Sequence, residues 1–203
     1  MEAGQPVQRK GGRPLSFDRD AALEQAMLRF WRHGYETTSI SDLTEAMGIT
    51  APSLYTAFGD KRRLFLEAVR RYAGDPEAVG TTIDEAPTAY DAARSILHGA
   101  VETFTGQTTP PGCLLASATA SGSTGSADVQ AIVAGYRQRI GDQLHARIAR
   151  DVTGGLLPDD TDAPALSGLV VTTVQGLSVL ARDGVSRAAL ARIADAALRA
   201  WPA

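Results

Sequence analysis

The order of apolar and polar positions along the chain predicts helices over most of its length. Apolar residues recur three or four positions apart, and glycine or proline separates the segments in which they do so. Residues 170–174 have a composition typical of a strand, but Pro164 and Gly184 on either side are helix start and stop signals. We therefore expect an all-α protein, with helices over 18–33, 39–47, 50–58, 61–73, 87–104, 126–152, 163–181 and 186–201.

Residues 39–58, called the reader below, predict two short helices joined by a tight turn. Ser39 or Thr38 can cap the first helix, and Gly48 can end it in the left-handed conformation. Thr50 can cap the second helix, which has about two turns and is too short to be stable unless one side is buried. The expected inward positions are Leu54 and Phe58, and the expected outward positions are Thr50, Ala51, Ser53, Tyr55 and Thr56.

This layout is typical of a helix-turn-helix, whose second helix enters the major groove of DNA. Small side chains near the start of that helix let its backbone approach the base edges. An ordinary helical corner is the alternative interpretation. Lys61, Arg62 and Arg63 favour DNA binding, because basic residues are unfavourable at the positive end of a helix unless an anion binds there. A DNA phosphate is such an anion.

The reader and its flanks resemble the N-terminal DNA-binding domain of TetR-type transcriptional regulators, over about residues 17–72. The resemblance implies an all-helical homodimer in which an N-terminal three-helix helix-turn-helix domain precedes a helical bundle for effector binding and dimerisation. It also implies that Thr38 or Ser39, together with Lys61, positions phosphates, while the outward residues of the reader face the groove. The matching motifs are Ile40-Ser41-Asp42-Leu43, Ala46-Met47-Gly48-Ile49, Ser53-Leu54-Tyr55 and Phe58-Gly59-Asp60-Lys61.

We expect three parts along the chain: a flexible basic arm over 1–15, the DNA-binding domain over 16–74, and the effector-binding and dimerisation domain over 75–203. The arm has almost nothing apolar to bury, and it carries Arg13 as a candidate DNA contact. The resemblance implies that such an arm can lie in the minor groove, and a plain disordered terminus is the other interpretation. The stretch 75–87, with prolines and Gly80, is expected to connect the domains, and part of it can be helical.

Within the DNA-binding domain, Phe30 and Trp31 are expected to support the second and third helices. In the C-terminal domain the segment 163–181 has no charged residue, so its helix must be covered on all sides, by the core or by a second subunit. Its length approaches that of a membrane span, but its serine, threonine and glutamine residues argue against one. With 186–201 it resembles the helices that TetR-type dimers pack together, and Gly168 and Gly176 allow close approach.

Charge and cysteine content refine this interpretation. The chain has 20 Lys+Arg and 23 Asp+Glu, a net charge of −3, but residues 1–73 carry a net +2 and residues 74–203 a net −5. Basic charge is thus concentrated at the end expected to meet DNA. A single cysteine excludes an internal disulfide framework, and the absence of an apolar leader indicates a cytoplasmic protein.

No motif for nucleotide binding, metalloprotease or serine hydrolase chemistry is present, so we expect no catalysis, cofactor or metal. Cys113 with His98 or His145 is the only conceivable Cys/His set for catalysis or metal binding, and so few scattered residues are close to what chance supplies. Cys113 is either a small buried apolar residue or a thiol that senses oxidants. Candidate residues for an effector pocket are His98, Phe104, Cys113, Tyr136 and Gln175.

These observations predict a sequence-specific DNA-binding regulator, a repressor that acts as a homodimer on a double-stranded operator and responds to a small molecule. Two readers must lie about 34 Å apart to fit successive major grooves. A ligand whose binding free energy favours another spacing of the two readers by about 1 to 3 kcal/mol is sufficient to switch DNA binding. The alternatives are a constitutive DNA-binding protein without effector, a thiol-sensing regulator acting through Cys113, and a helical enzyme with an incidental corner motif.

Overall fold

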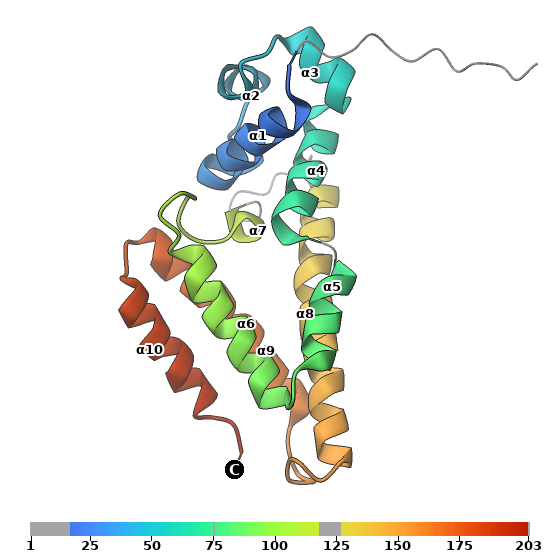
Figure 1. Cartoon of the computed structure of the whole chain (residues 1–203), viewed down its shortest axis with the longest axis vertical. Helices are drawn as coiled ribbons and strands as arrows, with labels where there is room; N and C mark the ends of the chain where they lie inside the picture. The colour runs from blue at the N-terminus through green and yellow to red at the C-terminus, as the bar shows by residue number, and fades with distance from the viewer. Residues whose placement is uncertain (1–16, 75, 118–126, 203) are drawn as a thin grey trace, which may run out of the picture.

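The computed structural model describes residues 17–74, 76–117 and 127–202, and every regular element among them is an α-helix. In Figure 1 α1–α4 form the upper part of the molecule, α5, α6 and α8–α10 extend through the lower part, and α7 lies between. The fold is therefore all-α, as expected. The helices are α1 Arg19–His33, α2 Ile40–Met47, α3 Ala51–Phe58, α4 Lys61–Ala73, α5 Pro76–Glu85, α6 Ala89–Phe104, α7 Leu114–Ser117, α8 Ala127–Thr153, α9 Ala163–Arg182 and α10 Arg187–Leu198.

Local side-chain chemistry sets the ends of the first four helices. At each N-terminus a side-chain oxygen accepts a backbone N–H that has no partner within the helix. The bounds expected for these helices are confirmed, because such caps depend on residues only two or three positions apart. The capping residues are Asp18, Ser39, Thr50 and Asp60. Ser126, which the sequence indicates as the cap of the longest helix, lies outside the described residues.

The stretch expected to connect the two domains, of which part can be helical, forms a helix over most of its length. Residues Pro76–Glu85 form α5 and pack against α8, with Ile83 only 1% exposed. Pro76 is the first helical residue and Pro87 follows the end, so neither interrupts the hydrogen bonds of the helix. Tertiary contact with α8 stabilises a segment whose local composition indicates a loop.

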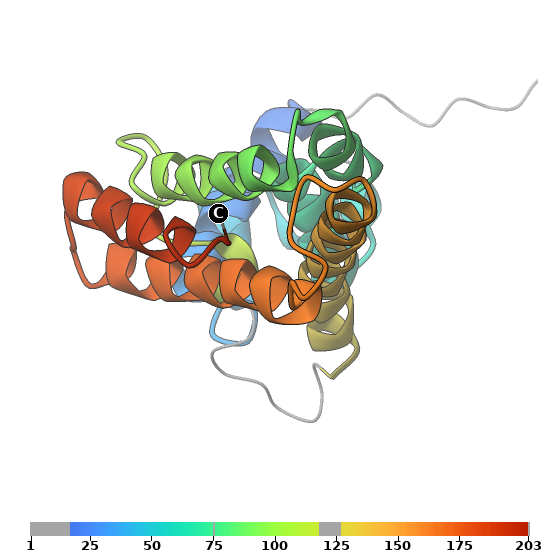
Figure 2. The same ribbon diagram turned by 90° about the horizontal axis from the view of Figure 1, so that it is seen from below.

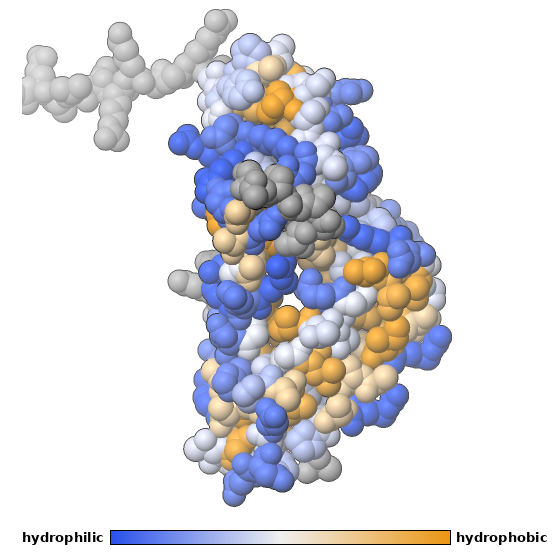
Figure 3. Space-filling model, turned by 180° about the vertical axis from the view of Figure 1, so that it is seen from behind, coloured by the Kyte–Doolittle hydropathy of each residue, from blue (hydrophilic) through white to orange (hydrophobic). Residues whose placement is uncertain are grey.

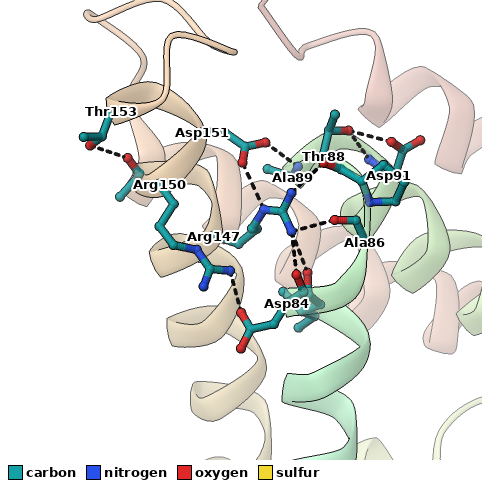
Figure 4. Close-up of polar contacts among 12 residues, drawn as sticks. Asp84, Ala86, Thr88, Ala89, Asp91, Arg147, Arg150, Asp151 and Thr153 are labelled. Carbon is teal, nitrogen blue, oxygen red and sulfur yellow. Dashed lines mark hydrogen bonds and ion pairs between the residues drawn. The ribbon is translucent and has the colours of Figure 1, made fainter.

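A buried ion pair fixes α5 and α6 to α8 (Figure 4). Arg147 Nε lies 2.9 Å from Asp151 Oδ1, and the two side chains are 8% and 6% exposed. Asp151 also accepts the backbone N–H of Ala89, the first residue of α6, at 2.6 Å. The Arg147 guanidinium donates to the backbone carbonyls of Ile83, Asp84, Ala86 and Pro87. The turn between α5 and α6 is therefore held by one pair of side chains.

The lower part of the molecule is a bundle in which α10 packs against α6 and α9, and α9 also packs against α8 (Figure 2). The segment 163–181 is helical, as expected, and not a strand. With 20 residues and a mean hydropathy of 1.5 over an 18-residue window, α9 is long and apolar enough to cross a membrane by length and composition alone. One face of α9 packs against α6, α8 and α10. On the remaining surface of the helix, Leu169 and Val179 are 36% and 56% exposed. A single chain thus does not cover this helix.

Candidate nucleic-acid interface

Gly48 makes the turn of the reader. It ends α2 in the left-handed conformation, with φ 64° and ψ 31°, and its N–H donates to the carbonyl of Glu45 at 3.2 Å. A side chain at this φ would strain the backbone. Two residues later the Thr50 side chain accepts the N–H of Ser53 and starts α3. The two helices and the tight turn expected from the sequence are therefore present.

The second helix of the reader has a buried face and an exposed face. Leu54 and Phe58 are 0% and 3% exposed, whereas half of Tyr55 is exposed. Thr50 and Thr56 are exposed on the outer face as well, and Ala51 and Ser53 are partly covered. The hydroxyls of Thr50 and Ser53 bond to each other at 2.9 Å, and Thr56 donates to the carbonyl of Pro52 at 2.8 Å. Tyr55 is therefore the longest side chain that α3 offers to solvent, together with a rim of small residues.

The structure separates the two candidate phosphate contacts before α2. Thr38 is 1% exposed and its hydroxyl donates to the carbonyl of Gly34 at 2.6 Å, so this side chain has no access to a phosphate. Ser39 is exposed and caps α2, in a reciprocal arrangement in which Asp42 accepts the Ser39 N–H at 2.8 Å. Of the pair, only Ser39 has a side chain exposed to solvent, and its contact with a phosphate stays a prediction. Burial of the hydroxyl next to the turn is a tertiary effect that the sequence does not reveal.

Lys61 lies at the start of α4, close to the reader. Its Nζ is 4.5 Å from the centre of the Tyr35 ring and 3.4 Å from the carbonyl oxygen of Glu36. Burial lowers the pKa of this amine from its ordinary value of 10.5. The side chain of Asp60 already accepts an N–H at this helix end, at 2.7 Å. The side chain of Asp60 thus partly compensates the positive end of α4, and the expected phosphate contact of Lys61 stays a prediction that depends on its position beside the reader.

The aromatic residues of α1 support different neighbours. Phe30 packs edge-on against Phe65 of α4, with ring centres 5.1 Å apart, beneath the reader. Trp31, the next residue, faces the lower part of the molecule: its ring is 4.7 Å from that of Tyr72, and its Nε1 donates to the carbonyl of Gly112 at 3.0 Å. The expectation that both residues support the second and third helices is therefore wrong for Trp31, because consecutive helical residues lie about 100° apart.

A cavity of about 370 Å³ lies in the bundle below α4. Four of the five candidate pocket residues line it: Phe104, Cys113, Tyr136 and Gln175. His98 does not, because its Nε2 lies 3.0 Å from Asp195 Oδ1, on α10. Tyr72 and Ala73, the last residues of α4, also form part of the wall. The cavity therefore touches the helix that begins at the reader.

Cys113 lies where this wall meets the DNA-binding part. It is 6% exposed, and its Sγ accepts a hydrogen bond from the Tyr72 hydroxyl at 3.5 Å. Its backbone N–H donates to Ser178 Oγ at 2.8 Å, and its carbonyl accepts from Arg182. Burial, followed by the neighbouring Cys113, raises the pKa of Tyr72. This packing favours the interpretation of Cys113 as a small buried residue.

The structure does not assemble a Cys/His site among the residues it describes. His98 pairs with Asp195, and His145 lies in a groove between α8 and α9 that does not include Cys113. Within residues 17–74, 76–117 and 127–202, no group of three or more His, Cys, Asp or Glu could hold a metal ion. Arg13 lies outside the described residues, so its expected place in the minor groove stays a prediction.

Comparison with known proteins places this geometry in a family. The model of the bacterial regulatory proteins of the tetR family matches residues 22–68, which span α1 to α4. The HTH-type transcriptional repressor ComR of Escherichia coli (strain K12) is 34% identical over 205 residues, which cover 99% of this chain and 97% of ComR. The chain belongs to the TetR family. It is, accordingly, a DNA-binding transcription regulator.

Other TetR-family proteins extend the likeness to the whole fold. A cysteine mutant of the TetR-family regulator CifR, solved in complex with 26-bp double-strand operator DNA, is 40% identical and has a TM-score of 0.86. The match covers 94% of this chain and all of that one. The uncharacterized HTH-type regulator YezE of Bacillus subtilis (strain 168) is 29% identical, over 84% of this chain and 89% of YezE.

Sequence reasoning missed several residues that shape this TetR-family protein. The sequence indicates no role for Tyr72 beyond its place in the expected helix 61–73, yet Tyr72 lines the cavity and contacts Trp31 and Cys113. Arg137 and Gln143 also line the cavity, but their charge and polarity are ordinary for the exposed side of a long helix. Only the arrangement of the surrounding helices reveals that both face inward.

Proposed function

We propose that this TetR-family protein is a ligand-responsive repressor that acts in the cytoplasm as a homodimer on a double-stranded DNA operator. Residues 16–74 bind DNA, and residues 75–203 bind the effector and form the dimer. One observation carries the proposal: the wall of the cavity includes the end of α4, whose start lies beside the reader. Two relatives support the same assignment: ComR is a transcriptional repressor, and CifR was solved in complex with operator DNA.

The coupling follows from the geometry of α4. Its 13 residues span about 20 Å, so a ligand that displaces Tyr72 and Ala73 tilts the helix and moves the reader at the other end. Gly112 and Cys113 carry the same displacement to α1, through the hydrogen bond from Trp31. A ligand with about 1 to 3 kcal/mol preference for the displaced state lowers operator affinity by roughly 5- to 150-fold.

Dimerisation follows from the uncovered side of α9. Exposed residues recur there at helical spacing, and a side chain added at Gly168 or Gly176 would meet no atom within 4 Å. Small residues on an open helical face let a second helix approach closely. Apolar residues gather along α9 and towards α10 in the rear view of the molecule (Figure 3). The exposed residues of this stripe are Ala165, Gly168, Leu169, Thr172, Gly176 and Val179.

Operator binding is tested by fluorescence anisotropy with the promoter fragment upstream of the protein's own gene. We expect binding that depends on salt and saturates, and we expect unrelated DNA to be a poor competitor of the promoter fragment. Tyr55→Ala should weaken it about tenfold or more, because an exposed aromatic side chain of the reader is lost. Tyr90→Ala is the matched control, since Tyr90 is 40% exposed on α6, in the bundle. Equal losses for both variants, or no binding at low ionic strength, would contradict the proposal.

A further inference from the structure

Two of the residues that line the cavity each carry a buried polar atom without a hydrogen-bond partner. The two atoms are Nη1 of Arg137 and Oε1 of Gln143, both on α8. Six residues separate them, which corresponds to about 9 Å along the helix axis. Buried polar atoms of a folded protein are nearly always paired, so an orphaned donor and acceptor in one cavity indicate a missing partner.

Arg137 is unusual among the arginines of its helix. Arg147 binds Asp151 and Arg150 binds Asp84, whereas Arg139 lies over the ring of Tyr136 at 4.8 Å. No carboxylate of the described residues lies within ion-pair distance of Arg137. Asp142 lines the groove on the outer side of Arg137 but forms no ion pair with it. Because a guanidinium keeps its charge, its partner must be a hydrogen-bond acceptor, and an anion is the best one.

The other residues that line the cavity indicate the chemistry of the part of the ligand that does not contact Arg137. The described wall includes Arg137 and Arg139 but neither aspartate nor glutamate, so its formal charge is positive. Most of the remaining wall is apolar or aromatic, with Ile96, Phe104 and Val174 as examples. A chamber with apolar walls and a buried cation selects an organic anion with an apolar body over a phosphate sugar or an inorganic ion.

We propose that the cavity binds small ionised carboxylic acids with an apolar chain or ring, and that the carboxylate lies on Nη1 of Arg137. The Gln143 amide can present either its oxygen or its NH2 group, depending on its orientation. It hydrogen-bonds a second polar group of the ligand where the ligand has one. The assignment of these acids as effectors rests on the proposed function, whereas their binding does not. A ligand so held also touches Tyr72 and Ala73 at the end of α4.

The test measures ligand binding without DNA, by isothermal titration calorimetry on the full chain. The probes are octanoate and phenylacetate, each paired with its neutral amide, octanamide and phenylacetamide. We expect at least one acid to bind at least tenfold more tightly than its amide. In Arg137→Gln this preference should disappear. In Arg150→Gln, the matched control with its charge outside the cavity, it should persist.

Loss of folding does not account for such a result, because Arg137→Gln removes a buried nitrogen that has no hydrogen-bond partner and should leave the melting temperature unchanged or raised. Amides that bind as well as the acids, an Arg137→Gln protein that keeps the preference, or failure of all four probes would overturn the inference. If the acids bind as expected but do not release the operator fragment, this inference stands and ligand control of DNA binding fails.

Discussion

At the residue scale, the contacts of Lys61 in the free protein bear on the phosphate contact predicted for it. In the free protein its ammonium group rests on the Tyr35 ring and the Glu36 carbonyl, which keeps the long side chain folded beside the reader. A DNA phosphate bound beside Lys61 would give the ammonium group an anionic partner in place of the neutral Glu36 carbonyl. Preorganisation of the side chain reduces the entropy that binding would otherwise cost.

The corresponding prediction concerns Lys61→Ala. We expect operator affinity to fall by a similar factor on all DNA sequences, and the slope of log affinity against log salt to shrink by about one, because one phosphate contact is lost. Anisotropy titrations at several salt concentrations measure the slope. Arg70→Ala is the control: it removes one charge from the same helix, at the end far from the reader. An unchanged slope in Lys61→Ala removes the phosphate role.

Asp42 sets the orientation of the reader against α1. It accepts from Ser39 and from Arg29, whose Nη2 lies 2.8 Å from Oδ1. Hydrogen bonds from Ser39, together with Arg29, lower the pKa of Asp42 from 3.8 to about 2. The ionised carboxylate therefore stabilises the folded state above about pH 4, and this contribution is lost as the pH falls towards about 2.

Asp42→Asn should accordingly be less stable than the wild type near neutral pH, with a difference that shrinks as the pH is lowered through this window. Thermal melts followed by circular dichroism at a series of pH values measure it. A difference that stays constant down to pH ~2 would mean that Asp42 acts through its shape and not its charge.

At the scale of elements, the pair Arg147–Asp151 holds α5 and α6 on α8. Arg147→Met leaves the Asp151 carboxylate buried without its cation and frees the carbonyls at the end of α5. We expect a loss of about 3–5 kcal/mol in the free energy of unfolding, measured by denaturant titration. Arg150→Met is the matched control, because its pair with Asp84 is more than half exposed and should contribute about 1 kcal/mol or less. Similar losses in both variants would contradict a special role for the buried pair.

At the scale of the whole molecule, the proposed dimer predicts that the exposed apolar side of α9 packs against a second subunit. Val179→Arg places a charge at the C-terminal end of this face, and we expect a monomer by sedimentation velocity and a large loss of operator affinity, because two readers no longer bind together. Leu156→Arg is the control: Leu156 is 63% exposed in the turn after α8, away from the stripe on α9. A Val179→Arg protein that stays dimeric would place the interface elsewhere.

The sequence by itself determined most of the helices, the reader and the family. Asp18, Ser39, Thr50 and Gly48 define helix ends through contacts within a few residues, and such local signals are legible in the chain. Apolar spacing placed Leu54 and Phe58 inside. Four of the five pocket candidates line one cavity, because apolar and aromatic faces of neighbouring helices converge there.

Only the tertiary structure decided the contacts between elements that are distant in the sequence. It buried Thr38, turned Trp31 towards Tyr72, and made a helix of residues that carry loop signals. It also left Nη1 of Arg137 buried without a partner beside an apolar cavity, while giving Arg147 a buried partner. Each of these outcomes depends on which surfaces meet across tens of residues, and the preferences of a residue and its close neighbours do not contain that information.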